Sequence, residues 1–234
     1  MKGPPIKGMV LSAGLGTRMR HLTADRPKPL IPVSGRTLID RTLDRLGEVG
    51  VREAVVNLHY RPGMIRAHLA GRTAPQIAFS DESDLLLETG GGVAKALPML
   101  GPAPFVVVNS DNVWIGADAF APLVSGWDAE AMDALLLLVP VERATGYSRA
   151  GDFSLDGGRL VRRGEAPRAP LVFTGAQILS PALFAEAVPE GPFSLNLIWD
   201  RAIAAGRAFG VVHPGGWCDV GTPEGLAEAE EALA

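Results

Sequence analysis

The feature of this 234-residue sequence that most constrains its fold is an alternation of short apolar runs and helical patterns through the first 140 residues. The apolar runs are rich in Val, Ile and Leu, and they predict strands over residues 6–12, 54–58, 76–80, 105–109 and 134–140. Between them, helices are predicted over residues 38–49, 62–70, 92–100 and 117–124, and in the first of these Leu38, Ile39, Leu43 and Leu46 recur at the spacing of one helical face. This alternation is typical of an α/β fold, a Rossmann-like three-layer sandwich with a mostly parallel sheet between two layers of helices.

The pattern changes after residue 140. Two short apolar stretches, 153–155 and 160–163, flank Asp156-Gly157-Gly158-Arg159 and predict a β-hairpin. The following segments predict strands over 171–179 and 209–213 and helices over 181–187, 195–205 and 223–233. Because no linker or repeat separates the two parts, we expect a single domain over residues 1–234, in which 141–234 form a small β-rich elaboration on 1–140.

Composition narrows the classes of partner and compartment. A net charge of −4 provides no basic footprint, so we expect no nucleic-acid partner. The lone cysteine, Cys218, cannot form an internal disulfide, which indicates a reducing compartment. No run of about 18 apolar residues predicts a membrane span, and residues 1–5 lack the apolar region of a signal peptide. We therefore expect a cytoplasmic protein that does not bind membranes. Separately from these features, we expect a monomer.

A turn of small residues follows the first predicted strand. Met9-Val10-Leu11 leads into Gly14 and Gly16, then Arg18, and Lys28 lies between two prolines. Glycines let a backbone approach a phosphate closely, and successive N–H groups in such a turn form a concavity for anions. An arginine can fork two phosphate oxygens, while a lysine acts as a point charge. This stretch therefore predicts a polyphosphate cradle, although the glycines alone also fit a structural strand-to-helix turn.

Two further polar segments follow predicted strand ends. Residues 13–30, 80–92 and 110–112 would all emerge at one edge of a parallel sheet, where α/β proteins bind ligands. The run Glu88-Thr89-Gly90-Gly91-Gly92 opens a predicted helix, whose free N–H groups suit a nucleotide phosphate or simply a tight helix start. Asp111 follows the apolar strand that ends at Asn109, and it is either a ligand-binding carboxylate or a helix N-cap.

The motifs Ala13-Gly14-x-Gly16-Thr17-Arg18-Met19 and Pro27-Lys28-Pro29-Leu30 resemble the signature of the sugar-1-phosphate nucleotidyltransferases. His21 departs from the family, where many members carry proline, and Ser110 replaces the glycine of the family's Gly-Asp. Asp219 stands before Val-Gly-Thr as in the family. The resemblance implies the nucleotide-diphospho-sugar transferase fold. The Glu-Thr-Gly-Gly-Gly segment is most similar to that of bacterial N-acetylmuramate-1-phosphate uridylyltransferases.

The resemblance implies a reaction of UTP with N-acetylmuramate 1-phosphate that yields UDP-N-acetylmuramate and pyrophosphate, in peptidoglycan recycling. In the family, Mg²⁺ lies on the residues that match Asp111 and Asp219. Arg18 would hold the β- and γ-phosphates, and Lys28 would neutralise charge at the α-phosphate, so the implied catalytic residues are Arg18, Lys28 and Asp111. The implied nucleotide contacts are Leu11, Ala13, Gly14, Gly16, Thr17, Glu82, Glu88, Thr89 and Asn109.

The base and sugar contacts are less sharply marked. Uracil offers one donor and two acceptors, so Glu82 could accept from N3–H, with Asp81 and Asp84 as alternatives. Residues 1–140 would bind the nucleotide and 141–234 the sugar. The family's Glu-Lys pair is Glu165-Ala166 here, which removes a lysine contact to the sugar phosphate. The implied sugar contacts are Gly151, Asp152, Glu165, Thr174, Gly175 and Asn196.

Other functions remain open at this point. Within the family, the alternatives are a mannose-1-phosphate guanylyltransferase and a glucose-1-phosphate thymidylyl- or uridylyltransferase. Relatives that make GDP-mannose usually carry an added C-terminal β-helix, and the thymidylyltransferases are longer, so chain length favours the N-acetylmuramate enzyme. An NAD-dependent oxidoreductase would need a third glycine where Met19 stands. A non-catalytic nucleotide sensor would not need both Asp111 and Asp219.

Overall fold

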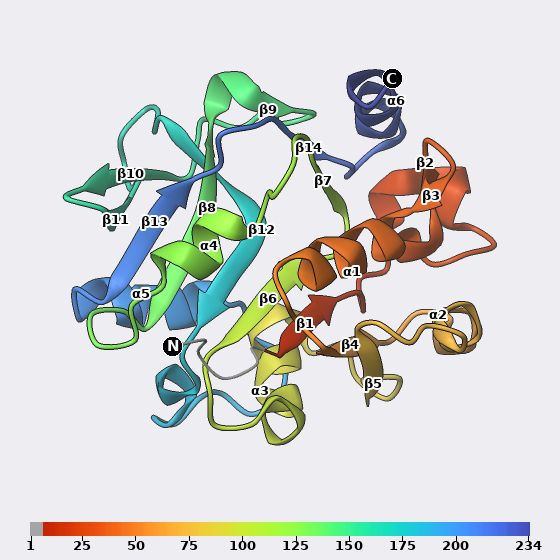
Figure 1. The fold of residues 1–234 in the computed structure, drawn as a ribbon, viewed down its shortest axis with the longest axis horizontal. Coiled ribbons are helices and arrows are strands. Elements are labelled where there is room, and N and C mark those ends of the chain that lie inside the picture. Colours follow the sequence, from red (N-terminus) through yellow and green to blue (C-terminus); the bar gives the residue numbers. More distant parts are fainter. Residues whose placement is uncertain (1–6) are drawn as a thin grey trace.

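A nine-stranded sheet forms the centre of the molecule in the computed structural model, which describes residues 7–234 (Figure 1). Its order is β10-β11-β13-β8-β12-β6-β1-β4-β5, and β11 and β12 run opposite to the other seven strands. The mostly parallel α/β sheet is therefore confirmed. The strands are β1 (Gly8–Leu11), β4 (Glu53–Leu58), β5 (Gln76–Asp81), β6 (Phe105–Asn109), β8 (Ala134–Pro140), β10 (Phe153–Asp156), β11 (Arg159–Arg162), β12 (Leu171–Leu179) and β13 (Ala208–Val212).

Helices cover both faces of this sheet (Figure 1). One face packs against α1 (Leu38–Glu48), α2 (Pro62–Leu69) and α4 (Ala121–Gly126) through a core that includes Leu43, Ile65 and Leu123. The other face packs against α3 (Glu88–Leu100) and α5 (Asn196–Ala204) through Val93 and Ile198. The three predicted layers are present. Among residues 7–234, no helix combines the length and apolar character needed to cross a bilayer.

Some predicted boundaries were wrong. The helix predicted over 92–100 begins at Glu88, and the one predicted over 117–124 runs from Ala121 to Gly126. The segment predicted as a helix over 181–187 is only a 3₁₀ turn, η4 (Pro181–Phe184). The first predicted strand starts at Gly8 in the structure, and the predictions for residues 1–6 lie outside the described part of the chain.

A second, three-stranded sheet was not predicted from the sequence. It pairs β7 (Asn112–Trp114), β14 (Trp217–Asp219) and β9 (Ala144–Thr145), strands too short to show a periodic pattern. The antiparallel register places Asp219 opposite Asn112, and the N–H of Val220 donates to the carbonyl of Asp111 at 3.1 Å. α6 (Pro223–Ala232) packs beside β14 and β2 (Figure 1). This small sheet therefore joins two chain segments more than a hundred residues apart.

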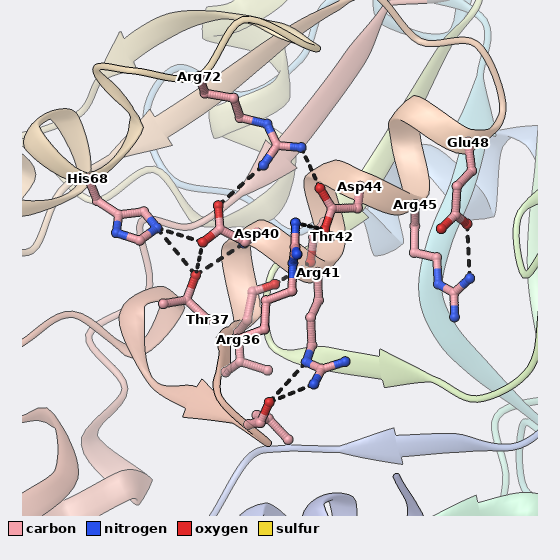
Figure 2. Close-up of polar contacts among 12 residues, drawn as sticks. Arg36, Thr37, Asp40, Arg41, Thr42, Asp44, Arg45, Glu48, His68 and Arg72 are labelled. Carbon is pink, nitrogen blue, oxygen red and sulfur yellow. Dashed lines mark hydrogen bonds and ion pairs between the residues drawn. The ribbon is translucent and has the colours of Figure 1, made fainter.

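A polar network fixes α1 against its neighbours (Figure 2). The Asp40 carboxylate accepts hydrogen bonds from Thr37 Oγ1 at 2.7 Å and Arg72 Nη1 at 3.2 Å, and it lies 2.8 Å from His68 Nε2. Arg41 donates through Nη2 to the Val33 carbonyl at 2.6 Å, which ties α1 to the hairpin of β2 (Pro32–Val33) and β3 (Arg36–Thr37). Since the 3₁₀ turn η2 (Lys28–Leu30) leads directly into β2, the network also fixes the turn that carries the predicted catalytic lysine.

Candidate active site

Two adjoining cavities open at the carboxyl ends of the parallel strands. Cavity A is lined by Leu11, Ser12, Ala13, Gly14, Lys28, Pro29, Asn57, Leu86, Glu88, Thr89, Asn109, Ser110 and Asp111. Cavity B is lined by Arg18, Thr89, Asn109, Asp111, Asn112, Arg149, Asp152, Phe153, Arg162, Phe173, Gly175, Gln177, Ser194, Leu195, Asn196, Trp199, Trp217 and Asp219. Thr89, Asn109 and Asp111 belong to both linings, so the cavities meet at these three residues, with the Asp111 carboxylate among them. The three polar segments predicted to share one sheet edge contribute to the two linings.

Asp111 and Asp219 are brought together at this junction. Burial raises the pKa of Asp219, and the negative charge of Asp111 raises it further, while Lys28, Arg18 and Arg149 act in the opposite direction. A partly buried carboxylate whose charge is destabilised by burial and by a second carboxylate favours a bound cation, and Mg²⁺ prefers such oxygen ligands.

The rest of a cation's coordination would have to come from elsewhere. Within residues 7–234, no group of three or more His, Cys, Asp and Glu side chains is arranged to hold a metal ion. A divalent cation on Asp111 and Asp219 would therefore complete its coordination with substrate or water oxygens, which is how Mg²⁺ commonly binds. The residues present fit a cation that binds together with a phosphate ligand.

Lys28 is the cation nearest to the Asp111 carboxylate. Its Nζ lies 2.6 Å from Asp111 Oδ2, and the residue is only 7% exposed. Gly16 packs against it, since a Cβ at position 16 would lie 3.0 Å from Lys28 Cβ. Pro27 and Pro29 flank it, so the backbone of this turn is restricted on both sides. The lysine is thus held in place at the junction of the two cavities.

Arg18 approaches Asp219 across Gly221. A Cβ at position 221 would lie 2.9 Å from Arg18 Nη1 and 3.0 Å from Asp219 Oδ1, so only glycine leaves room for both side chains. Arg18 is carried by the 3₁₀ helix η1 (Thr17–Thr23), which directly follows Gly16. Its guanidinium lines cavity B and is exposed to solvent. The predicted phosphate ligand therefore lies beside the predicted metal ligand.

The glycines that open α3 do not present the free N–H groups expected from the sequence. The amides of Gly90 and Gly91 both donate to the carbonyl of Phe193, at 2.8 and 3.1 Å. A Cβ at position 90 would lie 2.4 Å from the Phe193 ring. These glycines allow a loop to pack on the helix start, and only Glu88 and Thr89 of this segment line cavity A.

Glu82 occupies a different place from the one the sequence suggested. It is 1% exposed and lies outside the linings of both cavities. Its Oε1 accepts from Asn57 Nδ2 at 2.8 Å, and Asn57 Oδ1 in turn accepts from the Ser12 N–H at 2.7 Å. Glu82 thus supports Asn57 in the wall of cavity A. The alternatives Asp81 and Asp84 do not line this cavity either.

The sequence family model described as nucleotidyl transferase matches residues 7–234. The chain belongs to the nucleotidyl transferase family. The chain is 45% identical to the N-acetylmuramate alpha-1-phosphate uridylyltransferase of Caulobacter vibrioides, over 100% of this chain and 99% of the relative. It is 38% identical to the enzyme of the same name from Neisseria meningitidis, over 98% of both chains.

A solved structure shares the fold of this nucleotidyl transferase. UDP-glucose pyrophosphorylase complexed with UDP-glucose superposes with a TM-score of 0.78 at 19% identity, and the match covers 97% of this chain and 98% of the other. At this identity the likeness establishes the fold alone. Membership of the family makes the chain an enzyme that transfers nucleotidyl groups, and it removes the NAD-dependent oxidoreductase from the candidates.

Several predicted contacts of the nucleotidyl transferase do not reach either cavity. Glu165 lies in an exposed turn, and Gly151 is buried, with its carbonyl accepting from Arg163 Nε. Thr174 is buried, and its hydroxyl donates to the Leu137 carbonyl at 2.9 Å. Gly16 and Thr17 shape the loop behind Lys28 and Arg18 without lining a cavity. Of the predicted sugar contacts, Asp152, Gly175 and Asn196 do line cavity B.

Cavity B also contains residues that the sequence did not single out. Arg149, Arg162, Gln177 and Trp199 come from four separate elements or loops, and no motif joins them. Arg149 precedes the predicted Asp152 by three positions, which was the available signal for it. Gln177 and Trp199 lie inside runs of apolar residues, so only the tertiary structure shows that they meet.

Proposed function

We propose that this nucleotidyl transferase transfers a uridylyl group from UTP to N-acetylmuramate 1-phosphate and releases pyrophosphate. The observation that carries the proposal is the meeting of Lys28, Asp111 and Asp219 at the junction of cavities A and B. A phosphate at that point would contact the Lys28 ammonium and would meet a cation held by the two carboxylates. The full-length identity to enzymes named N-acetylmuramate alpha-1-phosphate uridylyltransferase supports the choice of base and sugar.

The nucleotide would occupy cavity A. The small residues Ala13 and Gly14 give its phosphates access to backbone N–H groups, with Leu11, Glu88, Thr89 and Asn109 around the nucleoside. Arg18 would fork the β- and γ-phosphates and stabilise the charge of the leaving pyrophosphate. Lys28 would compensate charge as the α-phosphorus is attacked. Since the sugar phosphate is itself the nucleophile, no side chain needs to form a covalent intermediate.

Asp111 and Asp219 would hold Mg²⁺ in this proposal. When bound, the ion neutralises phosphate charge and aligns the two reacting groups. The protein side of that arrangement is the carboxylate pair with Lys28 beside it, which fixes where the two phosphates can meet.

The sugar phosphate would occupy cavity B, whose charges suit it. N-acetylmuramate 1-phosphate carries a phosphate and a lactyl carboxylate. Arg149 is exposed at the cavity wall, and its nearest carboxylate oxygen, on Asp152, is 4.0 Å from Nη2. Asp152 is already engaged, accepting from Tyr147 Oη at 3.1 Å and from the Phe173 N–H at 3.1 Å. We assign the lactyl carboxylate to Arg149 on this basis.

The two parts of the chain contribute to different cavities. Residues 1–140 supply most of cavity A and residues 141–234 most of cavity B, and we propose that they work as one domain. One copy of the chain lines both cavities, so we propose that a monomer is competent. Cells make UTP in the cytoplasm, where we place the reaction.

The direct test is to incubate the purified chain with Mg²⁺, one nucleoside triphosphate and one sugar 1-phosphate, and to measure pyrophosphate. UTP, dTTP, GTP and CTP would each be paired with the 1-phosphates of N-acetylmuramate, N-acetylglucosamine, glucose and mannose. The proposal expects UTP with N-acetylmuramate 1-phosphate to give the highest kcat/KM. A higher kcat/KM with GTP and mannose 1-phosphate, or with any nucleotide and glucose 1-phosphate, would contradict the proposal and assign that activity instead.

A further inference from the structure

A buried amide in the wall of cavity B has no assigned role. Gln177 on β12 is 1% exposed, and its Oε1 accepts a hydrogen bond from Trp199 Nε1 at 2.6 Å. An indole N–H can only donate, so it fixes the oxygen of the carboxamide toward Trp199 and leaves Nε2 to face elsewhere. In the described part of the chain, residues 7–234, Gln177 Nε2 has no hydrogen-bond partner.

An unpaired buried N–H is unusual in a native protein. Such groups generally find an acceptor in the protein, in ordered water or in a ligand. Gln177 contributes to the lining of cavity B. The hydrogen bond from Trp199 prevents a rotation that would exchange the positions of Oε1 and Nε2. Gln177 therefore carries one buried donor with a fixed orientation, in a residue that lines cavity B, and a ligand in that cavity could supply the missing acceptor.

Trp199, which holds the oxygen of this carboxamide, belongs to an aromatic pair. The rings of Trp199 and Phe173 meet edge to face with centroids 4.8 Å apart, and both residues line cavity B. A sugar hydroxyl placed here would need an acceptor for its own O–H, which aromatic rings supply poorly. An acetamido group has a carbonyl oxygen that only accepts and a methyl group that packs well on aromatic surface.

We propose that Gln177 determines specificity for a 2-acetamido sugar: its Nε2 donates to the acetamido carbonyl, and the methyl group packs against Trp199 and Phe173. This inference rests on the proposed function, because it requires the sugar to lie in cavity B. It goes beyond that function by naming the residue that separates acetamido sugars from sugars with a hydroxyl at the same carbon.

Binding of two UDP-sugars tests the inference without reference to turnover. UDP-N-acetylglucosamine and UDP-glucose differ only in that substituent, and isothermal titration measures their dissociation constants on the same protein. The wild type is expected to bind UDP-N-acetylglucosamine about ten- to a hundredfold more tightly, because UDP-glucose would leave the buried Nε2 donor without an acceptor. Gln177→Met keeps the length of the side chain and removes the donor, and it should reduce the preference to less than about threefold.

Further variants keep the test decisive. Gln177→Glu replaces the donor with an acceptor and should also abolish the preference, whereas the same exchange at the exposed Gln76 should preserve it. Thermal denaturation checks folding. If the Gln177 variants do not fold, Trp199→Phe releases the carboxamide and should lower the preference at least about threefold.

Three results would overturn the inference: equal binding of the two UDP-sugars by the wild type, no binding of UDP-N-acetylglucosamine, or an unchanged preference in the folded Gln177 variants. The proposed function fails separately, if the wild type makes no UDP-sugar from UTP and N-acetylmuramate 1-phosphate.

Discussion

Lys28 Nζ lies 2.6 Å from Asp111 Oδ2, although the two residues are 83 positions apart in the sequence. The side chain of Lys28 is 9% exposed and that of Asp111 is 32% exposed, so the pair lies at the floor of the junction between the cavities. The lysine compensates part of the charge of two neighbouring carboxylates. The same ammonium is available to a phosphate that enters beside them.

Replacing Lys28 should separate its effect on catalysis from its effect on stability. Lys28→Ala is expected to lower kcat/KM by about a hundredfold or more, because the transition-state charge loses its nearest fixed cation. It should also lower the free energy of unfolding by about 1–2 kcal/mol, because Asp111 and Asp219 lose their compensating charge. Steady-state kinetics at saturating Mg²⁺ and urea denaturation measure the two effects. Lys95→Ala, at an exposed lysine outside both cavities, is the matched control, and near-wild-type turnover in Lys28→Ala would contradict the catalytic assignment.

Asp219 is expected to be required for activity, while its charge lowers the stability of the metal-free protein. Because burial and the charge of Asp111 raise the pKa of Asp219, the folded protein disfavours its ionised form. Neutralising it in Asp219→Asn should raise the unfolding free energy of the metal-free protein by about 1 kcal/mol, or roughly 2–4 °C in Tm. The same variant should lose the activation by Mg²⁺ that the wild type shows after EDTA treatment.

Calorimetry of the metal-free proteins measures the effect on stability. Glu165→Gln is the matched control, because it neutralises a carboxylate in an exposed turn. An Asp219→Asn variant that is less stable and remains fully active with Mg²⁺ would refute the assigned role.

Arg149 should distinguish between sugars that differ in the lactyl group. Arg149→Ala is expected to raise KM for N-acetylmuramate 1-phosphate about tenfold, because a charge-assisted contact is lost, and to change KM for N-acetylglucosamine 1-phosphate less than about threefold. Initial rates with both sugar phosphates measure this. Arg168→Ala removes another exposed arginine, one that does not line cavity B, and it should change neither KM value. An equal rise in KM for both sugars would contradict the assignment of Arg149 to the lactyl carboxylate and would indicate that it binds the phosphate that both sugars share.

His213 should make the fold sensitive to mild acid. Burial lowers the pKa of His213 below its ordinary value of 6.5, and it outweighs backbone hydrogen bonds at Ile115 and Gly216, which act in the opposite direction. Its Nε2 lies 3.0 Å from the carbonyl of Ile115, next to the β7–β14 pairing that carries Asp219. A buried base that resists protonation binds fewer protons in the folded state, so stability is complete above pH 6.5 and is lost as pH falls below that value.

Urea denaturation from pH 7.5 to 5.0 measures this dependence. His213→Gln should flatten the slope by up to about 1.4 kcal/mol per pH unit, whereas His21→Gln, at an exposed position, should leave it unchanged. A slope that is the same in the wild type and in His213→Gln would contradict the assignment.

The sequence predicted the elements that make continuous patterns. The central strands, the layers of helices and the approach of residues 13–30 to Asp111 follow from alternation, Gly-rich turns and the rule for parallel sheet edges. Glu82 shows a limit of this reasoning. Its carboxylate follows a strand end and was predicted to contact the base, but in the structure it accepts a hydrogen bond from Asn57 instead. That contact depends on the pairing of neighbouring strands.

Cavity B was the least predictable part for the same reason. The contact of Gln177 with Trp199 joins a strand to a helix 22 residues later, and neither residue is marked by its neighbours. The pairing of Asp219 opposite Asn112 depends on a strand of three residues, too short for any periodic signal. Residues assembled by such long-range contacts become visible only in the folded chain.

The most direct test of the account is the formation of UDP-N-acetylmuramate by the purified wild-type chain. UTP, N-acetylmuramate 1-phosphate and Mg²⁺ are mixed with the protein, and the UDP-sugar and pyrophosphate are measured together. The account predicts that both products appear in equal amounts, that EDTA prevents their formation, and that Asp111→Ala forms neither at a comparable rate. No UDP-N-acetylmuramate from the folded wild type, while another nucleotide and sugar phosphate react readily, would contradict it.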